Sequence, residues 1–234
     1  VCLPGDERMA VNAVARRVGL LHPKTTTFFL CDIQERFSGL IQHWPSVVHV
    51  ANLMLDFSEK MSIPVIATEQ YPRAFGRLVE DLHGVPAAVE GSTEPRHSEC
   101  KRIAVFEKTK FSMMNEAVTK HFNGLPTSKS NPESPEGPSV VLFGIEAHVC
   151  VQQTALELLQ MGYDVHIVAD GTSSQNVSDR KFAFDRLRQS GAYVTTYESV
   201  LFQLLRDAKH PSFKSVQPIF KTPRVDNGLL LTKE

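Results

Sequence analysis

The sequence is poor in cysteine, has no excess of either charge and has no long apolar run. Its 234 residues include 4 cysteines, too few for the disulfide scaffold of a small secreted domain. The 25 lysines and arginines nearly balance the 26 aspartates and glutamates, which argues against bulk electrostatic capture of nucleic acid. The apolar stretches are of strand length, well below the ~20 residues that a membrane span needs. We therefore expect a protein of a reducing compartment that binds neither nucleic acid nor a membrane.

What the sequence does contain is typical of one globular domain, with 42% hydrophobic and 22% charged residues. We expect the domain at residues 25–208. Residues 1–24 are expected to form a leader, either disordered or a surface helix, and residues 209–234 a tail that packs on the domain or on a partner subunit. Because residues 9–22 carry two arginines and no acid, a mitochondrial presequence remains the alternative to a cytoplasmic location.

Six short apolar segments alternate with helical patterns and predict the fold. They are nearly continuous in strand-forming residues rather than alternating, which is typical of parallel strands covered by helices on both faces. The expected strands are residues 25–31, 64–68, 102–107, 140–145, 165–169 and 192–196. Helices are expected at residues 45–61, 147–161, 178–190 (opened by an N-cap at Ser178) and 199–208, with inserted loops at residues 84–101 and 127–139. The fold class is therefore α/β, a three-layer doubly wound (Rossmann-like) domain whose six-stranded sheet is mainly parallel.

Three chemically active residues follow predicted strands. Sites in an open parallel sheet gather at the carboxyl ends of the strands, where Asp32, Lys108 and Cys150 stand. Cys150 falls in the first turn of a helix, where a thiol becomes more acidic and backbone N–H groups can hold an oxyanion. A carboxylate could accept its proton, and a lysine would stabilise both groups as anions. From the residues alone, a core cysteine, a capping aspartate and a surface amine remain open alternatives.

Taken in order, these segments resemble the isochorismatase-like cysteine hydrolases, a family that also includes nicotinamidases. Residues 32–34 resemble the family's Asp-x-Gln motif, residues 108–112 its Lys-x-x-x-Ser segment, and residues 144–151 its nucleophile turn. A closer resemblance is to the eukaryotic isochorismatase domain-containing proteins. It rests on residues 68–72, 110–113, 151–158, 168–170 and 207–214.

The resemblance implies a role for each of the three residues. Asp32 would be the general base, Cys150 the nucleophile and Lys108 the cationic partner of Asp32. Lys108 is preferred to Lys110 because the family's lysine precedes the serine by four positions.

The resemblance also implies the surroundings of the nucleophile. The family's non-proline cis peptide maps to Ile145–Glu146, and the backbone N–H groups of Glu146 and Cys150 would form the oxyanion hole.

Four further residues are expected as substrate contacts, namely Gln34, Phe37, Tyr71 and His148. For Phe37 and Tyr71, an aromatic pocket and ordinary packing are equally open. No metal or other cofactor is expected, because residues 68–72 lack the histidine of the nicotinamidase metal motif.

The expected function is hydrolysis of a small amide or a related carbonyl compound by a Cys150 thiolate. The alternative is a catalytically silent interaction protein on the same scaffold. A third possibility is a hydrolase that uses general acid–base chemistry, with Cys150 as a spectator. The family commonly associates, so the resemblance also implies a homo-oligomer.

Overall fold

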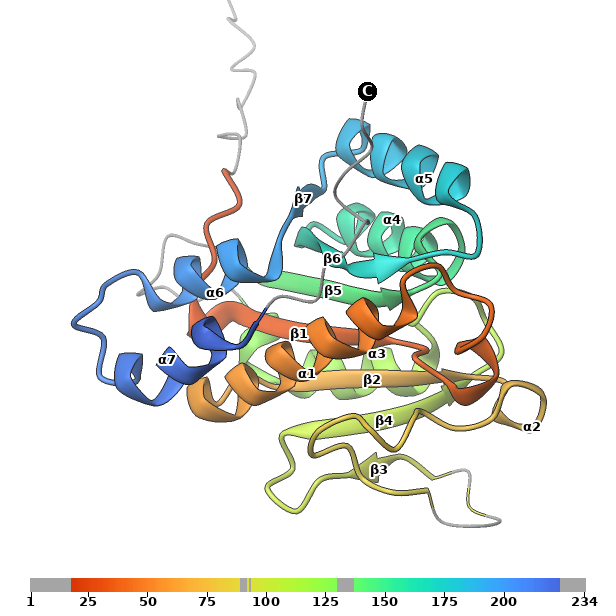
Figure 1. Cartoon of the computed structure of the whole chain (residues 1–234), viewed down its shortest axis with the longest axis horizontal. Helices are drawn as coiled ribbons and strands as arrows, with labels where there is room; N and C mark the ends of the chain where they lie inside the picture. Colours follow the sequence, from red (N-terminus) through yellow and green to blue (C-terminus); the bar gives the residue numbers. More distant parts are fainter. Residues whose placement is uncertain (1–17, 89–91, 93, 130–136, 224–234) are drawn as a thin grey trace, which may run out of the picture.

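The computed structural model describes residues 18–88, 92, 94–129 and 137–223, and it has a seven-stranded sheet at its centre (Figure 1). The strand order is β3-β4-β2-β1-β5-β6-β7. The strands are β1 (Thr26–Cys31), β2 (Val65–Gln70), β3 (Arg96–His97), β4 (Ile103–Lys108), β5 (Ser139–Ile145), β6 (Asp164–Ser173) and β7 (Tyr193–Thr195). All but β3 pair in parallel, which confirms the predicted α/β fold class.

The prediction of six strands is wrong, because β3 adds a seventh at the edge of the sheet. This strand lies inside residues 84–101, which we expected to be an irregular loop. It has two residues and pairs antiparallel with β4. Arg96 forms a salt bridge of 2.6 Å with Glu69 on β2, so tertiary contacts hold a strand that is too short to show hydrophobic periodicity.

Seven α-helices connect and cover the strands in the described part of the chain. They are α1 (Trp44–Met61), α2 (Pro72–Phe75), α3 (Glu116–Gly124), α4 (Gln152–Gln160), α5 (Val177–Gln189), α6 (Tyr197–Leu205) and α7 (Phe213–Lys221). The sequence analysis missed α2, α3 and α7. The N-cap of α5 is Asn176 and not Ser178, as predicted. The segment predicted as a helix over residues 147–161 begins with a π turn, Ala147–Val151, before α4.

Two hydrophobic cores lie on opposite faces of the sheet. Alternate residues of β1 divide between them, with Phe28 and Leu30 in one core and Phe29 and Cys31 in the other. The first core contains residues of α1, α6 and α7, and the second contains residues of α3, α4 and α5. Figure 1 shows α1 crossing one face of β1 and β2. Cys31 therefore points to the face that carries the helix after β5.

The ends of the described chain pack on the first core. Leu21 is buried, and its carbonyl oxygen accepts a hydrogen bond of 3.1 Å from Arg206. Val216 and Ile219 of α7 are buried in the core that includes α1. Residues 1–17 and 224–234, which hold most of the predicted leader and the end of the predicted tail, lie outside the described residues. Within the described ranges, no helix has the length and apolarity needed to cross a membrane.

Candidate active site

The candidate site lies where the strand order reverses. From β1, the strands β2 and β4 follow on one side of the sheet and β5, β6 and β7 on the other, so β1 and β5 flank the switch point at which ligands bind in doubly wound folds. Asp32 directly follows β1, Lys108 is the last residue of β4, and Cys150 lies in the π turn after β5. Because these strands are parallel, the three residues reach the same edge of the sheet.

The side chains of the three residues meet. Lys108 Nζ lies 2.7 Å from Asp32 Oδ2 and 3.5 Å from Cys150 Sγ. Lys108 and Asp32 are almost fully buried, and Cys150 keeps an exposed fraction of 7%. The structure therefore brings together the carboxylate, amine and thiol that the sequence analysis selected, and it leaves Cys150 in limited contact with the surface.

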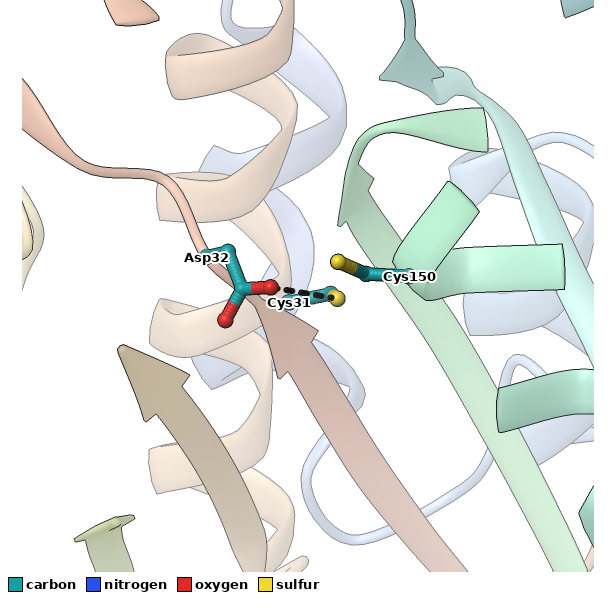
Figure 2. A group of neighbouring side chains, drawn as sticks. All are labelled: Cys31, Asp32 and Cys150. Atoms are coloured by element: carbon teal, nitrogen blue, oxygen red, sulfur yellow. Dashed lines mark hydrogen bonds between the residues drawn. The ribbon is translucent and has the colours of Figure 1, made fainter. Parts of the chain in front are cut away.

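Both oxygens of Asp32 have hydrogen-bond donors. Thr68 Oγ1 donates to Oδ1 at 2.7 Å, and Cys31 Sγ donates to Oδ2 at 3.5 Å (Figure 2). The backbone of Asp32 is left-handed, with φ of 52°, and its N–H donates to the carbonyl of Thr68 at 3.2 Å. The end of β2 therefore fixes the carboxylate beside the amine.

Lys108 is buried as the cation of the site. Burial alone would lower the pKa of the ammonium, but opposing electrostatic effects, of which the charge of Asp32 is the largest, outweigh it, so the pKa of Lys108 is raised. Its Nζ also donates to Gln70 Oε1 at 2.6 Å and to the carbonyl of Phe111 at 2.9 Å.

Lys110 lies elsewhere. It forms a salt bridge of 2.9 Å with Glu157 and is about half exposed. The structure thus places Lys108, and not Lys110, beside Asp32 and Cys150.

A glycine allows the turn that carries Cys150 to approach β1. Gly144 has φ of +117°, and a Cβ at this position would collide with the backbone oxygen of Cys31. A residue with a side chain would therefore push β5 away from the end of β1. The peptide bond one residue further on, Ile145–Glu146, is cis, as the family resemblance implied.

The π turn then sets the position of Cys150. The N–H groups of Val149 and Val151 donate to the carbonyl of Glu146 at 3.1 and 3.2 Å, and Thr154 Oγ1 donates to the carbonyl of Cys150 at 2.6 Å. The first N–H groups of a helix have no acceptor within the helix, and single π turns are frequent at functional sites. The N–H of Cys150 lies in this first turn.

Three of the expected substrate contacts, Gln34, Phe37 and His148, have protein partners. The side-chain amide of Gln34 donates to the carbonyls of Gln70 and Gly76 at 3.0 and 2.6 Å and accepts from the N–H of Gln70 at 2.7 Å. These contacts fit a residue that holds the surrounding loops. Phe37 stacks on Phe75 at 5.0 Å between ring centroids.

His148 and Tyr71 are nearer to the surface. His148 Nδ1 lies 3.0 Å from Ser174 Oγ, and its Nε2 lies 3.9 Å from Asp179 Oδ2. Tyr71 is 49% exposed and lines a cavity of about 360 Å³ together with Lys108 and Asn115. Tyr71 therefore shares a cavity with Lys108, and the lining of that cavity does not include Asp32 or Cys150.

Two site residues were missed by the sequence analysis: Cys31 and Thr68. Thr68 belongs to β2, so the rule that selects strand ends could have found it. Cys31 is completely buried, and the pKa of its thiol is raised well above the ordinary value. Burial is the largest cause, and a hydrogen bond with Cys150 and the charge of Asp32 raise the pKa further. Whether the Cys31 side chain faces Cys150 depends on which face of β1 the turn after β5 packs against. That is a property of the tertiary structure.

The sulfur atoms of Cys31 and Cys150 and a carboxylate oxygen of Asp32 lie within 4.8 Å of one another. Thiolates and a carboxylate can bind a soft divalent metal. Here the Lys108 ammonium lies 2.7 Å from the carboxylate and already supplies the positive charge, so the donor set fits a lysine-balanced site better than a metal centre.

Comparisons with known proteins agree with this arrangement. Residues 26–199 match the Isochorismatase domain. The isochorismatase domain-containing protein 2 of Xenopus laevis is 43% identical over 215 residues, which cover 92% of this chain and 93% of that protein. The structure of a MAR1 ribonuclease from Caenorhabditis elegans is 35% identical, with a TM-score of 0.75 and coverage of 92% of this chain and 98% of that chain.

A more distant likeness concerns the fold alone. The Escherichia coli YcaC gene product, called an octameric hydrolase of unknown specificity, is 19% identical with a TM-score of 0.64, and the match covers 86% of this chain and 96% of that chain. The match to the domain and the identity to the Xenopus protein both extend over most of the chain. The protein therefore belongs to the isochorismatase domain family.

Proposed function

We propose that the protein is a cysteine hydrolase that cleaves a small amide or a related carbonyl compound. The observation that carries the proposal is the buried contact of Cys150 Sγ with Lys108 Nζ at 3.5 Å, where the same amine lies 2.7 Å from Asp32. A thiol, a base and a cation in contact at the start of a helix are the groups that nucleophilic acyl transfer needs.

In the proposed reaction, Asp32 accepts the proton of the Cys150 thiol, and the thiolate attacks the carbonyl carbon of the substrate. The N–H groups of Glu146 and Cys150 donate to the oxyanion of the tetrahedral intermediate. When the C–N bond breaks, Asp32 returns the proton to the leaving amine. A water molecule then gives a proton to Asp32 and attacks the thioester, which releases the acid and restores the thiol.

Charge balance explains why a lysine completes this site. Before proton transfer, the buried group consists of a carboxylate, an ammonium and a neutral thiol, with a net charge of zero. After transfer it consists of a carboxylic acid, an ammonium and a thiolate, and the net charge is again zero. Since an uncompensated charge is costly in a buried site, Lys108 allows the proton to move without creating one.

A cavity of about 360 Å³ lies between Tyr71 and Asn115 and borders Lys108, a size that suits a small molecule. Asp32 and Cys150 are not among its lining residues, so the proposal rests on the contacts of the three side chains and not on this cavity. RNA is included among the substrates to be tested, because the Caenorhabditis elegans relative is named a ribonuclease. The near-neutral net charge of −1 provides no general attraction for a polyanion.

We also propose that the protein forms a homo-oligomer. The YcaC protein of the same fold is called octameric, and Tyr71 and Phe111, next to the residues of the site, are exposed. Sedimentation of the full chain tests this: a monomer at micromolar concentration contradicts the proposal.

The test of function compares Cys150→Ala with the matched variant Cys100→Ala, because Cys100 is an exposed cysteine outside the site. Small amides, esters and RNA are supplied as substrates, and adducts are located by mass spectrometry after labelling with iodoacetamide. We expect amide hydrolysis and a Cys150 adduct with the wild type and with Cys100→Ala, and neither of them with Cys150→Ala.

Other outcomes identify the alternatives. Hydrolysis that survives Cys150→Ala would support general acid–base chemistry with a spectator thiol. A folded wild type that hydrolyses nothing and whose Cys150 resists labelling would support the silent interaction protein.

A further inference from the structure

Cys31 lies beside the proposed nucleophile but takes no part in the proposed reaction. Its sulfur and that of Cys150 belong to one group of atoms within 4.8 Å (Figure 2). The sheet produces this proximity, because Cys31 is paired with Gly144 across β1 and β5, six residues before Cys150. Two thiols far apart in sequence are therefore held as neighbours by the strand register.

The two thiols differ in their access to solvent. Cys150 is exposed at 7%, whereas Cys31 is not exposed at all. Burial, then the hydrogen bond with Cys150, and then the charge of Asp32 raise the pKa of Cys31, so this residue stays a neutral thiol at ordinary pH. An oxidant from solution meets Cys150 first, and Cys31 is the reduced thiol at its side.

We propose that Cys31 is a resolving cysteine: a peroxide oxidises Cys150, and Cys31 then closes a reversible Cys31–Cys150 disulfide. The inference depends on the proposed function in one respect, namely that Cys150 is the reactive thiol. Closure requires the side chains to rotate until the sulfurs are ~2 Å apart.

Asp32 takes the proton of Cys150, and the thiolate attacks one peroxide oxygen. An S–O bond forms, the O–O bond breaks, and the leaving hydroxide takes the proton back from Asp32 to become water. The product is a sulfenic acid. Cys31 then passes its proton to Asp32 Oδ2, to which it already donates at 3.5 Å, and its sulfur attacks that of Cys150. The S–O bond breaks, and the second hydroxide leaves as water with the proton from Asp32. Two thiols are oxidised to one disulfide, and one peroxide is reduced to two water molecules.

This chemistry would switch the site off reversibly. The disulfide removes the nucleophile, and a dithiol or phosphine reductant restores it. It also prevents further oxidation of Cys150 to sulfinic and sulfonic acids, which ordinary thiols do not reduce.

The test uses the full chain exposed to hydrogen peroxide, blocked with N-ethylmaleimide and digested with trypsin without reduction. Cleavage after Lys24 and Arg36 and after Lys129 and Arg180 isolates the two cysteines in the peptides of residues 25–36 and 130–180. We expect these peptides to be joined in the wild type and in the matched control Cys100→Ser, and to separate after reduction by a phosphine. In Cys31→Ser, we expect no joined peptide and an irreversibly oxidised Cys150.

Labelling of untreated protein with iodoacetamide separates the two proposals. If Cys150 labels readily but peroxide gives its sulfinic acid in the wild type without the joined peptide, the resolving role of Cys31 is refuted and the proposed function stands. If Cys150 reacts with neither reagent in the folded protein, both proposals fail. The wild-type result needs no substitution, so a poorly folding Cys31→Ser does not weaken the test.

Discussion

His166 on β6 makes the stability of this protein depend on pH in a predictable way. The residue is 1% exposed, and neither ring nitrogen has a hydrogen-bond partner among the residues that the structure describes. Its ring stacks on Tyr193 at 4.8 Å between centroids. Burial lowers the pKa of His166 from 6.5 to about 4, because the imidazolium would lose its hydration without gaining a partner.

The sign and the size of the effect follow from proton linkage. The unfolded chain binds a proton at His166 below pH 6.5, whereas the folded chain does so only below about pH 4. Between these values the unfolded state holds more protons, so the free energy of unfolding decreases as the pH falls. The loss from this residue is negligible at pH 7.5, about 2 kcal/mol at pH 5, and about 3 kcal/mol below pH 4.

The perturbation is His166→Phe, which keeps an aromatic ring against Tyr193 and removes the titrating group. Urea unfolding of the variant and the wild type at pH 7.5 and pH 5 gives two stability differences. A constant packing cost cancels when one difference is subtracted from the other. We expect the variant to gain about 2 kcal/mol relative to the wild type on going to pH 5, or roughly 4–8 °C in melting temperature for a domain of this size. His166→Gln, which does not titrate either, should show the same gain.

The lowered pKa of His166 would be refuted if the stability of both variants fell by as much between pH 7.5 and pH 5 as that of the wild type. That outcome would mean that His166 is protonated in the folded state near its ordinary pKa, and the unpartnered burial would then be the wrong description.

Two other predictions concern the assembly of the site. Lys108→Gln leaves the carboxylate of Asp32 buried without its cation, so we expect the free energy of unfolding to fall by about 3–5 kcal/mol in urea unfolding. We also expect slower alkylation of Cys150 by iodoacetamide. The matched control Lys110→Gln should change neither the stability nor the alkylation rate. Gly144→Ala adds a Cβ against the backbone of Cys31 at a positive φ, so we expect loss of the folded protein or destabilisation by more than about 1 kcal/mol, measured by urea unfolding; a variant as stable as the wild type would show that β5 can move away at little cost.

The site could be predicted from the sequence because it depends on where strands end. Continuous apolar runs identify β1, β4 and β5 locally, and parallel pairing then brings their carboxyl ends to one edge without further information. Asp32 and Lys108 stand at two of these ends, and Cys150 lies in the π turn after the third. Preferring Lys108 to Lys110 needed the family spacing, since both lysines lie near the same strand end.

Other features depend on contacts that residue patterns do not encode. Glu69 lies on β2 between Thr68 and Gln70, yet its buried carboxylate binds Arg77 at 2.9 Å and Arg96 at 2.6 Å. Both arginines come from polar segments without periodicity, and the pairing with Arg96 accompanies β3. The π turn at Ala147–Val151 is likewise a property of hydrogen bonding, and its sequence is compatible with an ordinary helix.

Because the site is buried, the charges that its proposed chemistry needs also affect the stability of the fold. The Asp32 carboxylate and the Lys108 ammonium are removed from water together, so each is stable only while the other is present. Cys31 and Cys150 complete the same group, in which both sulfur atoms lie within 4.8 Å of a carboxylate oxygen of Asp32. The proposed hydrolysis and the proposed disulfide thus use one carboxylate, once for the outer thiol and once for the inner one. Which reaction occurs depends on whether Cys150 meets a carbonyl or a peroxide first.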